Sequence, residues 1–496
     1  MKLKLIAIAA LMAAGSVQAA SLTAADIDTA RGNGTLKEIR LTGSSAYRLA
    51  IAGYIQTICQ PGTIGVFFSA ADLIATGDGA GSGARAYACK LNTALGNWAT
   101  GTTLLVHKRD TGGSILGVAN VATNDASTKM MKVTAASCGT SVPYTNITTR
   151  TATCTQSENV APDAGFSDLE PNLLNQAPNL IDNVLGNPGS GSKLPVDLST
   201  LTVAPYWQAI FGVAVNLKAY RALQTAQGLA QDDTDANRPS LSKNWIRTAL
   251  TGNVDTTTDG LQGWGLVLGT GGNGKTVNVC RRDPGSGTQA TAQVYFLNNP
   301  CDPTNALVAA RQGGSTKPAP NANAGGVNVI ENSSTGDVLT CLTNTDNDAS
   351  TAYAIGIFSH ENVETGTKWR YVRVDGALPN RYIAGTVPSG AVNGSYDFVG
   401  EGTMQWNTTK VNANADLLAA LTDISTKSNT PDAIAALPTT GTANSPEGVM
   451  AAPLVWANIA APWTQLSAAQ KPYSSRLLHA AQLNGVSNSC SIYNTF

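Results

Sequence analysis

Two adjacent arginines stand before a short run of glycines and hydroxyl residues in segment 281–288, whose sequence is RRDPGSGT. The alternating residues 276–279 before it predict a strand, and the residues from Gln289 onward predict a helix. Free amides at a helix start can bind an anion together with neighbouring hydroxyls, and a guanidinium can hold two oxygens of a tetrahedral anion. The segment therefore predicts an oxyanion-binding loop. A charged turn before a capped helix is the alternative.

The same order of strand, hydroxyl-bearing turn and helix occurs near the start of the chain. Ser44 and Ser45 stand between an alternating strand at 39–42 and residues 47–58, which have helical spacing. Either serine could cap that helix, because serine oxygens readily accept hydrogen bonds from first-turn amides.

A third segment of this kind is 111–114, with the sequence TGGS. It lies between an apolar strand expected at 102–106 and a helix expected at 115–122. Three hydroxyl-bearing helix starts, each after a strand, predict that the three loops converge on one ligand.

Asp168 could give such a site its selectivity. A carboxylate only accepts hydrogen bonds, so it repels a fully ionised anion and accepts from one that carries a proton. Hydrogen phosphate carries such a proton and sulfate does not. Asp168 therefore indicates a preference for phosphate, and a carboxylate on a surface turn is the alternative.

Residues 269–276 match the phosphate-loop pattern of nucleotide-binding proteins, with the sequence GTGGNGKT. That motif requires a helix directly after its last residue. Here the alternating residues 277–279 predict a strand, and an exported chain would meet no nucleotide pool. We therefore expect a glycine-rich connection between two strands.

Catalytic and metal-binding patterns are weak. No serine lies in a G-x-S-x-G elbow, and the cysteines and histidines have no spacing typical of zinc ligands. We therefore expect no enzymatic activity, no metal and no cofactor. The three histidines, which are scattered, are His107, His360 and His479.

The N-terminus has the order of a cleavable signal peptide. Lys2 and Lys4 precede an apolar run at 5–14, and small residues follow up to Ala20. We expect cleavage after residue 19 and a soluble product in the periplasm or outside the cell. The first cysteine is Cys59, so a lipid anchor near the cleavage site is not expected.

The remaining composition excludes two classes of partner. The net charge is −1 and 13% of residues are charged, which leaves no basic surface for nucleic acid. No later stretch is long and apolar enough for a membrane span.

The eight cysteines favour disulfides in an exported protein. Their connectivity is open, and Cys138 with Cys154 and Cys280 with Cys301 are the locally plausible pairs. Segment 77–101 and segment 302–335 are rich in glycine and other loop residues, and we expect both to be loops. Strands and helices alternate elsewhere, which predicts an α/β fold.

The order of these segments resembles the phosphate-binding proteins of bacterial ABC importers, within the type 2 periplasmic binding protein superfamily. Leu41–Ala46 and Asp110–Ser114 are similar to that family's first two phosphate loops. Asp163–Asp168 resembles the D-F-G-A-S-D segment, whose last residue accepts the phosphate proton. Residues 281–288 are similar to the R-R-x-D-G-S-G-T loop, although Pro284 stands where the family has its aspartate and Asp283 comes one residue early.

The resemblance implies two α/β lobes joined by crossover strands, with inorganic phosphate or a similar oxyanion bound between them and an ABC importer as a membrane partner. It implies lobe one at 20–215 with disulfide-tied insertions at about 60–100 and 123–160, lobe two at 216–398, and a return to lobe one at 399–496. A secreted phosphatase-like relative and a surface or matrix protein that reuses the fold are the alternatives. The expected ligand-binding residues are Ser44, Ser45, Thr111, Gly112, Gly113, Asp168, Arg282, Ser286, Gly287 and Thr288.

Overall fold

A computed structural model of the chain describes residues 20–70, 83–176, 194–254, 259–283, 285–299, 301, 319–320, 323, 325–437, 448–452, 466–478 and 493–494. The expected signal peptide, residues 1–19, lies outside the described residues, as do Pro284 and Cys490.

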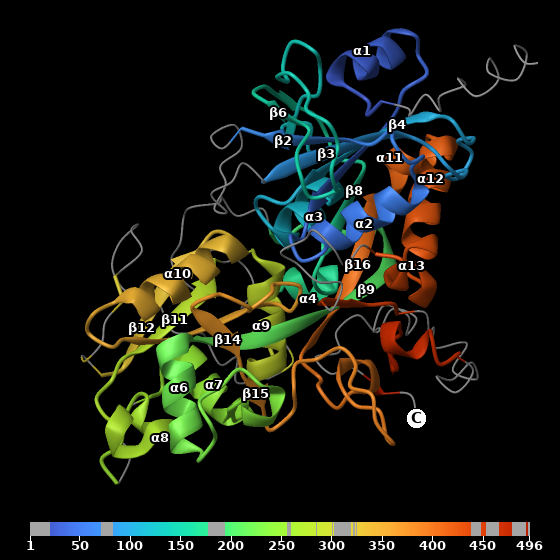
Figure 1. The fold of residues 1–496 in the computed structure, drawn as a ribbon. Coiled ribbons are helices and arrows are strands. Elements are labelled where there is room, and N and C mark those ends of the chain that lie inside the picture. The colour runs from blue at the N-terminus through green and yellow to red at the C-terminus, as the bar shows by residue number, and fades with distance from the viewer. Residues whose placement is uncertain are drawn as a thin grey trace, which may run out of the picture.

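One mixed sheet runs through the described part of the molecule, with the strand order β12-β11-β13-β9-β16-β8-β1-β4-β3-β2-β6 (Figure 1). We call the part from β16 to β6 the first lobe and the part from β13 to β12 the second lobe. The first lobe contains β1 (Lys37–Gly43), β2 (Gly65–Ser69), β3 (Ala84–Lys90), β4 (Thr103–Arg109), β6 (Ala152–Cys154), β8 (Ala164–Ser167) and β16 (Val399–Asn407). The second contains β11 (Val277–Arg282), β12 (Val327–Asn332), β13 (Tyr353–Ser359) and β14 (Trp369–Tyr371).

The long strand β9 (Leu201–Asn216) joins the two lobes. Its first part, up to Ile210, pairs with β16, and Phe211 to Val215 pair with β13. Its residues from Tyr206 onward are buried without alternation, as in a strand that is covered on both faces. The expected α/β class with two lobes joined by crossover strands is confirmed.

Helices cover the sheet in both lobes (Figure 1). In the first lobe α3 packs on β8 and β1, and in the second α10 packs on β13 and β11. The helices are α1 (Ala24–Gly32), α2 (Arg48–Ile58), α3 (Ser114–Ala122), α4 (Pro171–Leu174), α6 (Leu217–Ala226), α7 (Lys243–Thr251), α8 (Gly265–Leu268), α9 (Gly287–Leu297), α10 (Thr335–Asn347), α11 (Thr408–Asn412), α12 (Ala415–Lys427) and α13 (Pro431–Ala435).

Short strand pairs complete the description. These are β5 (Lys129–Met131) with β7 (Ser157–Asn159), β10 (Ser240–Leu241) with β15 (Arg373–Val374), β18 (Leu477–Leu478) with β19 (Tyr493–Asn494), and β17 (Val449–Met450) beside β9. No helix among the described residues is long and apolar enough to cross a membrane.

Three loop predictions were wrong in part. Segment 77–101 contains β3, which pairs with β2 and β4, and segment 302–335 contains β12, which pairs with β11. Residues 302–318 lie outside the described part. The run at 269–276 does lead into a strand, as expected, but it follows helix α8 rather than another strand.

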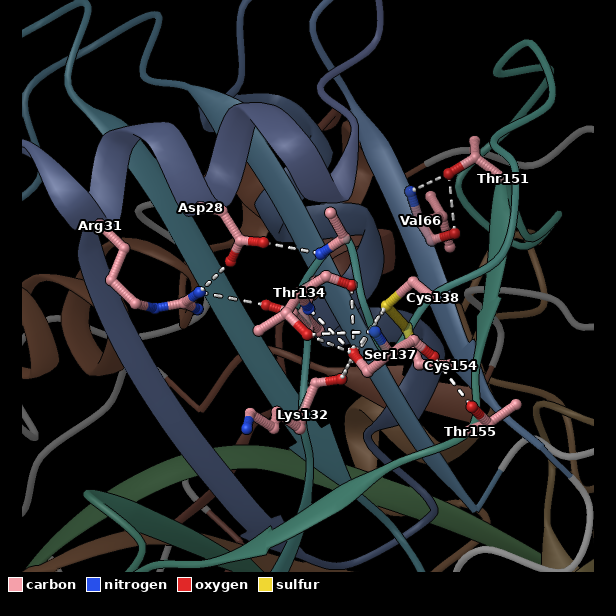
Figure 2. Close-up of a disulfide and its surroundings, with 12 residues drawn as sticks. Asp28, Arg31, Val66, Lys132, Thr134, Ser137, Cys138, Thr151, Cys154 and Thr155 are labelled. Atoms are coloured by element: carbon pink, nitrogen blue, oxygen red, sulfur yellow. Dashed lines mark hydrogen bonds and ion pairs between the residues drawn. A yellow bond between two sulfur atoms is a disulfide. The ribbon is translucent and has the colours of Figure 1, made fainter.

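The expected disulfide-tied insertion at 123–160 contains β6, the last strand of the sheet in the first lobe, and Figure 2 shows its disulfide. Cys138 and Cys154 are joined, with their Cα atoms 3.9 Å apart, which confirms that pair. Next to them, the Thr151 hydroxyl donates to Val66 O over 2.9 Å and accepts from Val66 N over 2.9 Å. Arg31 of α1 donates to a backbone carbonyl of the same insertion. The insertion is therefore attached both to the edge of the sheet and to α1.

The other predicted pair was wrong, because Cys280 is bonded to Cys341. Cys280 lies on β11 and Cys341 on α10, and both side chains belong to one apolar cluster. Cys59 is joined to Cys89, and Cys301 is disulfide-bonded as well. Disulfides persist in oxidising compartments, so these bonds are consistent with a location outside the cytoplasm.

Candidate functional site

The first loop, which contains Ser44 and Ser45, follows β1 at the point where that strand meets β8. Gly43 has φ 100°, and a Cβ there would lie 2.2 Å from Phe166 O, so only glycine fits. Ser44 N donates to Phe166 O over 3.0 Å and the Ser44 side chain is buried. The capping prediction was wrong: Tyr47 is the N-cap of α2, and Ser44 Oγ accepts from Ala46 N within the turn. Ser45 is half-buried in the same turn.

The second loop ends in α3, which begins at Ser114. Gly112 and Gly113 have φ values of 97° and 67°, which glycine adopts without strain. The Thr111 hydroxyl donates to Gly83 O over 3.1 Å, so it faces the start of β3 and not Asp168. Ser114, which is fully buried, supplies the hydroxyl on the inner side of this loop.

Asp168 lies where the loops of the first lobe meet the second lobe, and 2% of the residue is exposed. Ser44 donates its hydroxyl to Asp168 Oδ1, and Thr288 Oγ1 of the second lobe donates to Oδ2 over 3.3 Å. Asp168 N donates to Ser114 Oγ over 3.1 Å. Burial raises the pKa of Asp168, while the Ser44 hydroxyl and the charge of Arg282 oppose that rise. Asp168 is thus a buried carboxyl group and not a surface residue.

The third loop begins where β11 ends, and it places Arg282 beside the second loop. The Arg282 guanidinium is buried, and its Nη2 donates to Ser333 O over 2.9 Å and its Nη1 to Thr335 Oγ1 over 3.4 Å. Its Nε has no hydrogen-bond partner among the described residues, and Asp283 Oδ1 is 3.9 Å from it. Neutral acceptors at the start of α10 therefore orient this guanidinium.

Helix α9 completes the third loop with Ser286 as its N-cap, and it begins two residues before the expected start. A Cβ on Gly287 would lie 2.1 Å from Ser114 Oγ and 2.7 Å from Asp168 Cβ, so glycine allows the two lobes to approach. The amides of Gly287 and Thr288 lie in the first turn, where amides have no partner within the helix.

The two lobes are also joined by a main-chain hydrogen bond at this point. Ile115 N of α3 donates to Gly285 O over 3.1 Å. A Cβ on Gly113 would lie 3.4 Å from Ser286 Cα and 3.9 Å from Arg282 Nη2. The structure thus brings together Ser44, Gly113, Asp168, Arg282, Ser286, Gly287 and Thr288. It places the Thr111 hydroxyl away from them.

Sequence reasoning missed three residues of this region. Ser114 belongs to the second loop but was not among the residues that the sequence predicted to bind the ligand. Lys108 is fully buried at the end of β4, and a lysine next to the apolar run at 102–106 was a signal that could have been used. Glu361 follows β13, and burial raises its pKa to about 7, against the lowering charges of Arg48 and Arg85.

Arg281 differs from its neighbour Arg282. It forms an ion pair of 2.8 Å with Glu331, and both side chains are buried. Within the described ranges there is no group of three or more histidine, cysteine or acidic residues that could hold a metal ion.

Two lobes joined by a long strand, with polar loops that meet between them, define a two-lobed α/β fold. Searches of family models and of curated proteins find no match to this chain. Among solved structures, the chain is similar to PstS from Borrelia burgdorferi, with 10% identity, a TM-score of 0.31, and coverage of 78% of this chain and 92% of that one. It is also similar to a possible phosphate-binding protein from Planctomyces limnophilus, with 8% identity, a TM-score of 0.31, and coverage of 78% and 87%.

Proposed function

We propose that this chain is a solute-binding protein that holds a protonated tetrahedral oxyanion, hydrogen phosphate, between its lobes. One observation carries the proposal: the buried Asp168 carboxyl group of the first lobe meets Thr288 and the Arg282 charge of the second lobe. Hydroxyls, helix-start amides, one cation and one acceptor are the groups that recognise such an anion.

Each group has a separate task in this binding. Arg282 neutralises the anion, and the hydroxyls of Ser44 and Thr288 can turn from Asp168 to the anion oxygens. Asp168 accepts the P–OH hydrogen bond. Sulfate has no such proton, so its binding would leave a buried carboxylate without a donor, which costs about 1–3 kcal/mol or roughly ten- to hundredfold in affinity.

Ligand capture would also close the lobes. The Ile115–Gly285 hydrogen bond and the Thr288–Asp168 hydrogen bond both cross between them. An anion that contacts both lobes favours the closed arrangement, as in hinge closure of binding proteins.

The proposed place of action is the periplasm or the outside of the cell. The signal-like N-terminus and the three disulfides of the described residues support it. An ABC importer is the membrane partner that the sequence resemblance suggests. A pull-down of the mature protein with a candidate importer, in the presence and absence of phosphate, tests that part separately.

Isothermal titration of the purified mature protein with phosphate, arsenate and sulfate at several pH values tests the binding proposal. We expect phosphate and arsenate to bind and sulfate to bind much more weakly. The absence of heat with every oxyanion would contradict the proposal. Turnover of a phosphomonoester that is lost in Asp168→Asn would instead favour the phosphatase-like alternative.

A further inference from the structure

Lys108 is the most completely enclosed charged side chain near this site, with an exposed fraction of 0%. Its ammonium donates to Gly43 O over 3.0 Å, to Ser44 O over 2.9 Å and to Asp110 Oδ1 over 2.5 Å. An ammonium has three donors, so every one of them is used. A buried ammonium is tolerated only with such partners, because its desolvation costs several kcal/mol.

These contacts connect the segments that form the first-lobe side of the site. Gly43 and Ser44 belong to the first loop, and Asp110 begins the second. The Lys108 Nζ atom also lies 5.8 Å from the centre of the Phe166 ring, two residues before Asp168 on the chain. One ammonium therefore contacts both loops and lies near the Phe166 ring of β8, the strand that ends directly before Asp168.

We propose that Lys108 is a positioning residue, which fixes the Ser44 main chain so that the Ser44 hydroxyl can serve a bound anion. The inference rests on the proposed function of the site. The two carbonyls that Lys108 holds lie on either side of the Ser44 nitrogen and side chain, so they set the direction of its hydroxyl. A purely structural lysine would contribute to stability and leave the affinity for the anion unchanged.

Two paired substitutions separate these roles. Lys108→Met with Asp110→Asn removes both charges with little change in shape, so no lone buried carboxylate is left. Lys108→Gln with Asp110→Asn keeps an amide donor that can reach a loop carbonyl. A remote control is Arg238→Met with Glu364→Gln, which removes an ion pair of 2.6 Å between a buried arginine and a partly buried glutamate.

Phosphate titration and thermal melting are measured for each variant. We expect the methionine pair to bind phosphate roughly ten- to hundredfold more weakly, the glutamine pair to recover most of that loss, and the remote control to bind as the wild type does. In a Ser44→Ala background, the methionine pair should weaken binding no further, because Lys108 acts through Ser44. If the methionine pair does not fold, Lys108→Leu with Asp110→Asn, which also removes the donor and both charges, takes its place in the cycle.

The outcomes are distinct. A wild-type protein that binds no phosphate contradicts the proposed function itself. A wild-type protein that binds phosphate, together with a folded methionine pair whose affinity is within about twofold of it, overturns the role of Lys108 alone. An undiminished effect of the pair in the Ser44→Ala background also overturns it.

Discussion

The two lobes present different chemistry to the site between them. The first lobe contributes a closely bonded network, in which Lys108 holds the loop carbonyls and Ser44 donates to Asp168. The second lobe contributes Arg282, whose hydrogen bonds go to a carbonyl and a hydroxyl and not to a carboxylate. Under the proposed function the lobes divide the tasks: the first lobe would distinguish protonation states of the anion, and the second would supply charge that no nearby carboxylate has fully neutralised.

The same difference separates two neighbouring residues of the second lobe. Side chains alternate along a strand, so Arg281 and Arg282 point to opposite faces of β11. Arg281 is neutralised by Glu331 at 2.8 Å. Arg282 has Asp283 Oδ1 at 3.9 Å from its Nε, so it has no comparably close carboxylate partner, and under the proposed function its charge serves the ligand.

The largest effect should come from removal of the charge on the second lobe. We expect Arg282→Ala to weaken phosphate binding by at least about a hundredfold, because a charge-assisted hydrogen bond to a buried anion contributes about 1.5–3 kcal/mol and a guanidinium can make two. Arg282→Lys keeps the charge but lacks the paired donors of a guanidinium, so its phosphate affinity should lie between those of the wild type and Arg282→Ala. Calorimetric titration measures the affinity of both variants. An unchanged Kd in Arg282→Ala would show that the second lobe does not supply the charge that binds phosphate.

A second effect concerns Glu361, which follows β13 of the second lobe and lies near charged groups of the first lobe. Burial raises its pKa from 4.5 to about 7 in the folded protein. Because the folded-state pKa is raised, its contribution to stability is fully present below pH 4.5 and is lost as the pH rises through about 7. The loss is on the order of 3 kcal/mol. Glu361→Gln does not titrate, so it should be more stable than the wild type above pH 7 and differ less in acid.

Urea unfolding at a series of pH values measures this difference. The wild type should lose stability relative to Glu361→Gln between pH 4.5 and about 7. Parallel curves for the two proteins across this range would show that Glu361 does not titrate there.

Asp168→Asn tests the selectivity assigned to the first lobe. An amide can donate to a fully ionised oxygen, so the preference for phosphate over sulfate should fall by about tenfold or more. Competition between the two anions in one titration measures the ratio directly. If the ratio is retained in the variant, selectivity arises elsewhere.

The smallest effects distinguish two hydroxyls of the second loop. Ser114→Ala leaves Asp168 N without its acceptor, and we expect a loss of about 1 kcal/mol, or several-fold in phosphate affinity. Thr111→Val removes a hydroxyl that donates to Gly83 O, and its affinity should stay within about twofold of the wild type. Equal losses of phosphate affinity in the two variants would mean that the second loop changes its orientation when the anion binds.

Much of the site could be predicted because its parts are local. Strand, glycine turn and helix are encoded within short segments, and the three segments at 39–58, 102–122 and 276–297 fold close to the expected bounds. The expected meeting of Asp168 with Thr288 depended on the order of the segments along the chain.

The missed features depend on distant neighbours. Strand β3 is rich in alanine, which has a low strand propensity. It forms a strand because β2 and β4 pair with it on either side. Nothing in the sequence around Lys108 shows that three acceptors from two loops surround its ammonium. Helix α2 likewise begins at Arg48 with Tyr47 as its N-cap, while the Ser44 hydroxyl donates to the distant Asp168 instead of capping the helix.

If the chain is exported as proposed, the bond between Cys280 and Cys341 has a consequence for maturation. Cys59–Cys89 and Cys138–Cys154 each join cysteines that are consecutive along the chain, whereas Cys280–Cys341 passes over Cys301. An oxidant that links thiols in the order in which they emerge from a translocon would pair Cys280 with Cys301 first. Cys280, on the strand that ends at Arg282, would then bond to Cys341 only after thiol–disulfide exchange. The yield of correctly bonded protein should therefore depend on a disulfide isomerase.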